Sequence, residues 1–180
     1  MIATSSQTVG PFFSFGLSTN LALGQVASPE AAGERLTFRV RILDGENTPI
    51  PDAMVELWQA DAAGIYGMPS AQFRGFGRLG TDANGSCTFE TIRPGVAVDD
   101  RTGAQASHLN LCLFMRGLLR HLYTRAYFAG DPAIEQDAVL MLVPEERRHT
   151  LIAQPVAGTS AEWMFEIRLQ GERETVFFDL

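Results

Sequence analysis

The residues whose types and spacing best suit metal binding lie in one run of the sequence, from His108 to Arg116. Leucine occupies every second position from 109 to 113, and this period of two predicts a β-strand. His108 and Asn110 therefore point to the same face of the strand, about 7 Å apart. Two imidazoles in this arrangement would bind one metal ion, but here the second position carries an amide. The run therefore predicts half of a metal site.

Length, composition and charge exclude several classes of protein. The chain has 180 residues, of which 46% are hydrophobic, enough for one domain with a packed core. No apolar run reaches the roughly 20 residues of a membrane span, and the first residues lack the basic and apolar regions of a signal peptide. The net charge is −7 with scattered basic residues, which argues against nucleic-acid binding. We expect a cytoplasmic protein in which Cys87 and Cys112 stay reduced.

Alternating apolar and polar residues predict a chain built mainly of strands. Turn residues at Asp82–Gly85 predict a hairpin around them, and His108–Phe128 reads as a second hairpin. Residues 144–153 look like one short helix, and 20–34 and 96–106 look like surface loops. We predict an all-β fold, a two-sheet antiparallel β-sandwich with an N-terminal arm and one short helix. The predicted strands are 36–43, 54–60, 76–79, 87–92, 108–117, 118–128, 163–169 and, in a closing hairpin, 175–178.

The first 34 residues differ in character from the rest and are predicted to form an arm and loop, followed by the β domain at 35–180. Phe12, Phe13 and Phe15 crowd into the arm, and burying each ring would contribute about 1.5–3 kcal/mol. Such an arm either folds back on its own core or lies across a partner chain. The residues alone leave both readings open, and the family resemblance described next favours packing on a partner.

Several segments, taken in order, resemble the intradiol ring-cleaving dioxygenases over nearly the whole chain. The resemblance implies a β-sandwich core and a non-haem Fe(III) with which O₂ cleaves an aromatic ring between two hydroxyl groups. The segments that carry it are Ser6–Phe12, Val55–Asp61, Gly77–Arg78, Thr91–Gly95, Leu113–Gly117, Thr124–Phe128 and Ile167–Asp179.

The resemblance also implies where iron ligands would stand. In the family's iron-bearing subunits the ligands are two tyrosines and two histidines, and these positions fall here on Tyr66, Ala97, His108 and Asn110. Alanine is no ligand, an amide is a weak one, and a missing phenolate leaves the ferric charge uncompensated in a buried site. We therefore expect this chain to bind no metal and to hold no catalytic residue. The vestigial Tyr66 and His108 would then be ordinary hydrogen-bonded residues, with a residual metal site as the alternative.

Within the family, the resemblance is to the non-iron alpha subunits of heteromeric enzymes, which pair with an iron-bearing beta subunit. It implies protocatechuate (3,4-dihydroxybenzoate) and O₂ as substrates. Thr8, Gly10 and Pro11 in the arm, together with Arg116, match positions that line the partner's pocket. A guanidinium suits the substrate carboxylate, and glycine lets backbone approach a flat ring. Turn chemistry for Gly10–Pro11 and simple solvent exposure for Arg116 stay as alternatives.

Two other functions are compatible with a β-sandwich. A transthyretin-like binding or carrier module would have no need of the N-terminal arm. An autonomous enzyme with another metal or none would need a new constellation of residues. Ser107–His108 has no acidic partner set by spacing, and the chain has no Gly-x-Ser-x-Gly motif.

Overall fold

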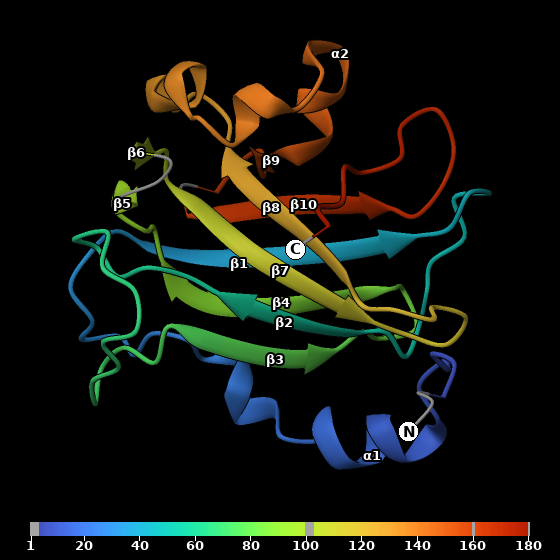
Figure 1. Cartoon of the computed structure of the whole chain (residues 1–180). Helices are drawn as coiled ribbons and strands as arrows, with labels where there is room; N and C mark the ends of the chain where they lie inside the picture. Colours follow the sequence, from blue (N-terminus) through green and yellow to red (C-terminus); the bar gives the residue numbers. More distant parts are fainter. Residues whose placement is uncertain (1–3, 100–102, 160, 180) are drawn as a thin grey trace.

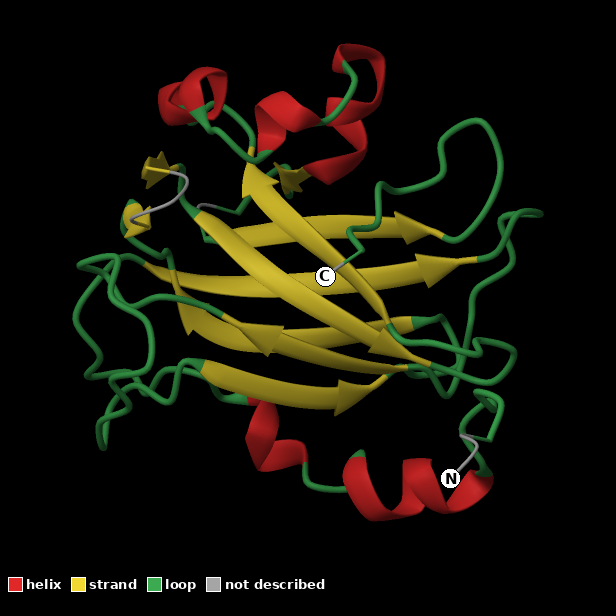
Figure 2. Cartoon of the chain, in the orientation of Figure 1, coloured by secondary structure: helices red, strands yellow, loops and turns green. Residues whose placement is uncertain are grey.

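The structure is a computed structural model that describes residues 4–99, 103–159 and 161–179. Strands dominate it, as the sequence predicted (Figure 1, Figure 2). They are β1 Arg35–Leu43, β2 Met54–Trp58, β3 Phe76–Gly80, β4 Ser86–Ile92, β5 Ala97–Asp99, β6 Gly103–Gln105, β7 His108–Phe114, β8 Leu122–Phe128, β9 Ile152–Pro155 and β10 Glu162–Arg168. The helices are α1 Pro11–Leu17 and α2 Glu145–Arg148, with short 3-10 turns η1 Leu21–Gly24, η2 Pro132–Gln136, η3 Leu140–Leu142 and η4 His149–Leu151.

Eight strands form one curled sheet in the order β3-β2-β7-β8-β9-β10-β1-β4, and β5 and β6 form a small second sheet. The short β9 joins the two halves of the large sheet, because its first residues pair with β8 and its last with β10. The halves face each other across the main core, where the Phe38 ring on β1 lies 6.5 Å from the Phe128 ring on β8. The sheet is therefore nearly closed into a barrel (Figure 1).

The prediction of an antiparallel sandwich of two separate sheets is therefore corrected. Pairing is parallel between β1 and β10 and again between β8 and β9. Parallel neighbours need a crossover of a dozen or more residues, and the segment from 129 to 151, which carries η2, η3, α2 and η4, supplies it. This segment also corrects the single helix predicted at 144–153, which divides into α2, η4 and the start of β9.

Two predicted hairpins are also wrong, and one is confirmed. The turn at Asp82–Gly85 forms, with the Gly85 N–H donating to the Asp82 carbonyl at 2.9 Å. However, β3 pairs with β2 and β4 pairs with β1, so the turn carries the chain from one half of the sheet to the other. The closing hairpin reduces to one isolated bridge between Tyr123 and Phe178. Strands β7 and β8 pair antiparallel as predicted.

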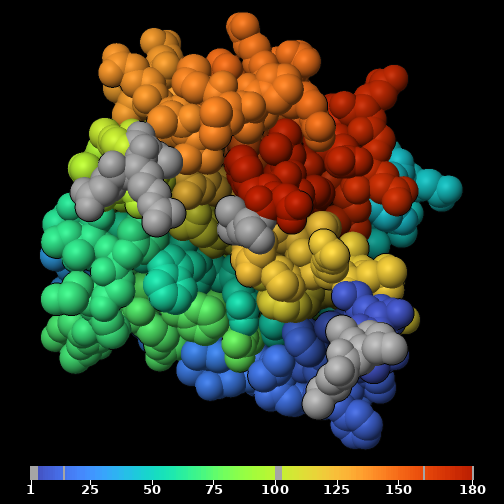
Figure 3. Space-filling model, in the orientation of Figure 1, coloured from blue at the N-terminus to red at the C-terminus, as the bar shows by residue number. Residues whose placement is uncertain are grey.

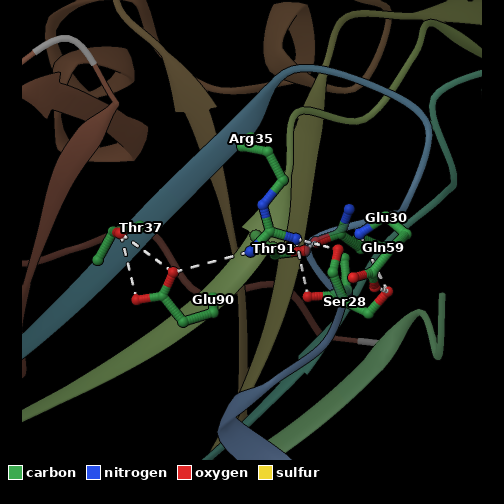
Figure 4. A network of polar contacts seen from close by, with 8 residues as sticks. Ser28, Glu30, Arg35, Thr37, Gln59, Glu90 and Thr91 are labelled. Atoms are coloured by element: carbon green, nitrogen blue, oxygen red, sulfur yellow. Dashed lines mark hydrogen bonds and ion pairs between the residues drawn. The ribbon is translucent and has the colours of Figure 1, made fainter. Parts of the chain in front are cut away.

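The predicted surface loop at 20–34 is in part a core element. Val26 and Ala27 are buried in the main core, and the Val26 N–H donates to the Glu90 carbonyl of β4 at 2.9 Å. Arg35 at the start of β1 fastens this segment, because its guanidinium donates to the carbonyls of Ala27 and Ser28 (Figure 4). The other predicted loop, 96–106, carries β5 and β6.

Cys87 and Cys112 are both free and buried. None of the helices in the described part of the chain has the length and apolarity needed to cross a bilayer.

Candidate functional site

The outer face of one half of the sheet carries a row of side chains that crosses four strands. Phe76 of β3, Trp58 of β2, Asn110 of β7 and Arg125 of β8 are successive cross-strand partners. Directly opposed residues on neighbouring strands project to the same face. The alternate positions, such as Leu57, point into the main core. The strand period therefore brings these four side chains together on the face away from that core.

A tight loop after β2 holds Tyr66 over this row. The Asp61 carboxylate accepts hydrogen bonds from the N–H groups of Ala63 and Ile65 at 2.9 and 3.0 Å. Gly64 has a φ of +81°, and a Cβ there would lie 2.0 Å from the Val96 carbonyl oxygen. The loop therefore needs glycine at this position to pack against the start of β5.

Tyr66, His108 and Asn110 meet in one hydrogen-bonded group. The Tyr66 hydroxyl lies 2.9 Å from Nε2 of His108, and Nδ2 of Asn110 donates to the Tyr66 oxygen, also at 2.9 Å. Nδ1 of His108 lies 2.7 Å from the Ala106 carbonyl oxygen, which can only accept. Nδ1 therefore carries the proton, and Nε2 accepts the Tyr66 hydroxyl. Three of the four positions matched to iron ligands are thus brought together, with their polar atoms bonded to one another.

Burial keeps both ring groups neutral. His108 is only 2% exposed. Desolvation, followed by the nearby Arg125 charge, lowers the pKa of its imidazole to about 4. Desolvation also raises the pKa of the Tyr66 phenol, against the opposing effect of the Asn110 hydrogen bond. At neutral pH the pair is therefore an uncharged phenol and an uncharged imidazole.

Behind His108 lies a buried carboxylate that the sequence reasoning missed. The Tyr127 ring packs on His108 with centroids 5.8 Å apart, and its hydroxyl donates to Asp137 at 2.9 Å. Asp137 also accepts the backbone N–H groups of Ala106 and Leu140 at 2.8 and 2.7 Å. Asp137 thus ties the crossover to the strand that bears His108. Nothing in its local sequence marks it out, because its partners come from other segments.

A cavity of about 600 Å³ lies over the cross-strand row. Figure 3 shows this face, where residues of β2 and β7 lie in a recess between the loop around 61–76 and the red C-terminal segment. The walls are largely apolar, and Tyr66, Asn110 and Arg125 are among the polar groups that enter them. The wall residues are Glu56, Trp58, Tyr66, Phe76, Asp99, Gln105, Asn110, Leu111, Cys112, Phe114, Tyr123, Thr124, Arg125, Val139 and Phe178.

Ala97, the fourth position matched to an iron ligand, is buried at the start of β5. Its backbone lies beside Gly64, so it borders the Tyr66 loop. Its methyl group offers no donor atom. Tyr66 and His108 therefore supply the only phenol and imidazole at the four positions, and this donor set does not fit the ferric site of the family.

The residues predicted to line a partner's pocket converge at the other end of β7. Thr8 accepts a hydrogen bond from the Gly117 N–H at 2.8 Å, which ties the arm to the turn after β7. Gly10, Pro11 and Arg116 line one depression of about 430 Å³. The Arg116 side chain is 75% exposed and pairs with Asp52 at 2.9 Å. Figure 3 shows the blue N-terminal segment lying against the yellow residues that follow β7.

This second group is separate from the first. His108 begins β7 and Arg116 lies in the turn after its last residue, Phe114, so about 20 Å of extended strand separates the two ends. Thr8, Gly10, Pro11 and Arg116 therefore form a surface of their own, which the Tyr66 group does not share.

Comparison with known proteins identifies the family of the chain. Residues 9–171 match the sequence pattern of a dioxygenase family, Dioxygenase_C. The chain belongs to the intradiol dioxygenase family. It is 39% identical to the protocatechuate 3,4-dioxygenase alpha chain of Burkholderia cepacia, over 98% of this chain and 97% of that one. It is 33% identical to the beta chain from the same organism, over 88% of this chain and 74% of that one.

Solved structures of intradiol dioxygenases share the fold. The dioxygenase domain of a carbohydrate-binding fusion protein from Streptomyces sp. SirexAA-E aligns with a TM-score of 0.66 at 21% identity, over 96% of this chain and all of that domain. The 3-chlorocatechol 1,2-dioxygenase of Rhodococcus opacus 1CP gives a TM-score of 0.66 at 24% identity, over 92% of this chain and 72% of that one. The curled mixed sheet is therefore the fold of this family.

Proposed function

We propose that this chain is the non-iron alpha subunit of a heteromeric protocatechuate 3,4-dioxygenase. Its partner is an iron-bearing beta subunit, and the assembly converts 3,4-dihydroxybenzoate and O₂ to 3-carboxy-cis,cis-muconate in the cytoplasm. The iron is held by the beta subunit, and this chain completes the substrate pocket and the assembly. The similarity to an alpha chain over nearly its full length supports this assignment.

The observation that carries the proposal is the Tyr66–His108 hydrogen bond. An intradiol site needs a phenolate oxygen and an imidazole nitrogen directed at the metal. Here the Tyr66 hydroxyl and Nε2 of His108 are directed at each other, 2.9 Å apart. Ala97 and Asn110 replace the other tyrosine and histidine, so no second anionic donor balances a ferric charge.

The N-terminal arm and Arg116 are the parts of this chain that we expect to contact the beta subunit and its substrate. Phe12 and Phe15 of α1 are 85% and 70% exposed, so the arm presents apolar surface that packing within the chain leaves uncovered. Arg116 lines the same exposed depression as Phe15 and can attract the substrate carboxylate. We propose that this surface closes the partner's pocket through Thr8, Gly10, Pro11 and Arg116.

Co-expression with an iron-bearing beta chain tests the proposal. We expect the two to co-purify as a coloured complex that contains iron and consumes protocatechuate, whereas the lone chain contains no iron and has no turnover. Two matched variants assign the metal: His108→Gln in this chain leaves iron per complex unchanged, and His→Gln in the His-x-His of the partner removes it. Iron and turnover in the lone chain would contradict the proposal. Failure to bind any beta chain would favour the binding-module alternative.

A further inference from the structure

We propose that the cavity over β2, β3, β7 and β8 is a binding site in this chain for a monocyclic aromatic monocarboxylate. The carboxylate pairs with Arg125, and the ring lies against Trp58 and Phe76. The inference goes beyond the proposed function, and it applies to the lone chain as well as to a complex.

Arg125 provides the cation. Its side chain is half-buried in the cavity wall, and its guanidinium donates to the neutral Gln105 amide oxygen at 2.8 Å. No ion pair joins it to a carboxylate among the residues that the structure describes, whereas the carboxylate of the wall residue Glu56 is paired with Arg78 at 2.5 Å. A guanidinium in a largely apolar cavity attracts an anion more strongly than one in water, and it binds carboxylates through paired hydrogen bonds.

The positive charge of Arg125 acts on the Tyr66–His108 pair. The Arg125 charge acts to lower the pKa of both His108 and Tyr66. Asn110 stands directly opposite Arg125 in the β7–β8 pairing, so the amide and the guanidinium project side by side from the same face.

The remaining walls suit an aromatic ring. Trp58 and Phe76 continue the cross-strand row, and Phe114 and Phe178 add two more rings to the lining. A volume of about 600 Å³ lies within the range of small-molecule sites, which combine apolar walls with a few convergent polar groups. Aromatic side chains pack favourably on a flat ring at tilted or offset geometries.

A ligand hydroxyl would find an acceptor. The Tyr66 oxygen donates its proton to His108 and accepts from Asn110, which leaves one lone pair unused among its described contacts. Glu56 and Asp99 also line the cavity. Arg125 is the one cationic side chain among the lining residues that the structure describes, so a second carboxylate on the ligand would have no cationic partner and the site favours monoanions over dianions.

Titration of the full-length chain with 4-hydroxybenzoate, followed by tryptophan fluorescence and calorimetry, tests the inference. We expect saturable binding with one site per chain. Arg125→Gln should weaken binding about ten- to hundredfold, and Arg125→Lys by less, because a charge-assisted hydrogen bond is lost or only partly replaced. Arg120→Gln, which removes an exposed arginine after β7, is the matched control and should bind as the wild type does.

Neutral 4-hydroxybenzamide and the dianion terephthalate serve as comparison ligands, and both should bind at least about tenfold more weakly. The inference would be overturned if the amide bound the wild type as tightly as 4-hydroxybenzoate does, or if Arg125→Gln bound 4-hydroxybenzoate as tightly as the wild type does. It would also be overturned if the wild-type chain, shown to be folded by its thermal midpoint, gave no saturable binding. Should the lone chain be insoluble, the complex is titrated, where the wild type binds one more equivalent than Arg125→Gln. Iron absorbance in that complex reports the partner's site separately, so a failure of the subunit assignment is distinguished from a failure of the cavity proposal.

Discussion

The phenolic oxygen of Tyr66 lies 2.9 Å from Nε2 of His108, although the two residues are 42 positions apart in the chain. A loop held by Asp61 and Gly64 brings the phenol to the imidazole. The imidazole is fixed in one tautomer by the Ala106 carbonyl. The phenol and the imidazole therefore satisfy each other's hydrogen-bonding groups.

Tyr66→Phe should destabilise the chain by about 1–3 kcal/mol. The substitution keeps the ring but leaves Nε2 of His108 without its donor, and it leaves Nδ2 of Asn110 with the Trp58 carbonyl as its remaining acceptor. Urea unfolding measures the loss. Tyr123→Phe is the matched control and should cost less, because the Tyr123 hydroxyl has the weakly polar Cys112 thiol as its hydrogen-bond partner. Equal losses for the two variants would contradict the role given to the Tyr66 hydroxyl.

Stability should fall in acid because of His108. Its pKa of about 4 in the folded chain lies below the usual value of 6.5, so the unfolded state binds a proton first. The contribution of the neutral imidazole is complete above pH 6.5 and is lost as the pH falls toward 4, by about 3 kcal/mol. Unfolding free energies from pH 7.5 to 4 measure the slope. His108→Gln should flatten it and His121→Gln, in an exposed position, should not; an unchanged slope in His108→Gln would refute the assignment.

Asp137→Asn should destabilise the chain by about 2–4 kcal/mol. Its two carboxylate oxygens accept the Tyr127 hydroxyl and backbone N–H groups that include those of Ala106 and Leu140. The asparagine amide has only one acceptor oxygen, and its NH₂ group would face the hydroxyl or N–H groups that now donate to the carboxylate. Tyr127→Phe, which removes a single donor, should cost about 1 kcal/mol. Thermal unfolding compares the two, and a smaller loss for Asp137→Asn than for Tyr127→Phe would show that Asp137 does not organise the crossover.

Phe12→Ser with Phe15→Ser should weaken assembly with the beta subunit at least about a hundredfold, because two rings no longer become buried. The stability of the lone chain should change by less than about 0.5 kcal/mol, since both rings are already exposed. Phe13→Ser is the contrasting variant and should destabilise the chain itself, because this ring packs 5.3 Å from Phe114. Size-exclusion chromatography and urea unfolding give the two measurements. Unimpaired assembly of the double variant would place the interface elsewhere.

Arg116→Gln should raise the KM of the complex for protocatechuate roughly tenfold, because a charge near the substrate carboxylate is removed. The KM for catechol, which has no carboxylate, should not change. Chain stability should change by less than about 1 kcal/mol, because the Arg116–Asp52 pair is exposed. Asp52→Asn, which frees the same guanidinium, is the control and should not raise KM. Parallel increases for both substrates would indicate a structural effect.

Much of the local structure was predictable because a strand's period of two needs no tertiary information. The burial of Phe38 and Val40 in β1, the common face of His108 and Asn110, and the β7–β8 hairpin all follow from it. Strand partners were less predictable. The turn at Asp82–Gly85 has hairpin chemistry, yet its flanking strands pair with others, because core packing selects which edges meet.

The sequence by itself determined which side chains stand at the four positions that the family resemblance matches to iron ligands, namely one phenol, one imidazole, one amide and one methyl group. Only the tertiary structure decided what those groups do. In the folded chain Tyr66 is hydrogen-bonded to His108, and Arg125 lies opposite Asn110 in the β7–β8 pairing. Asp137 accepts a hydrogen bond from Tyr127, whose ring packs on His108. Each of these contacts joins different segments. Their geometry depends on strand order and loop packing, which arise from the burial of the whole core and leave no local trace in the sequence.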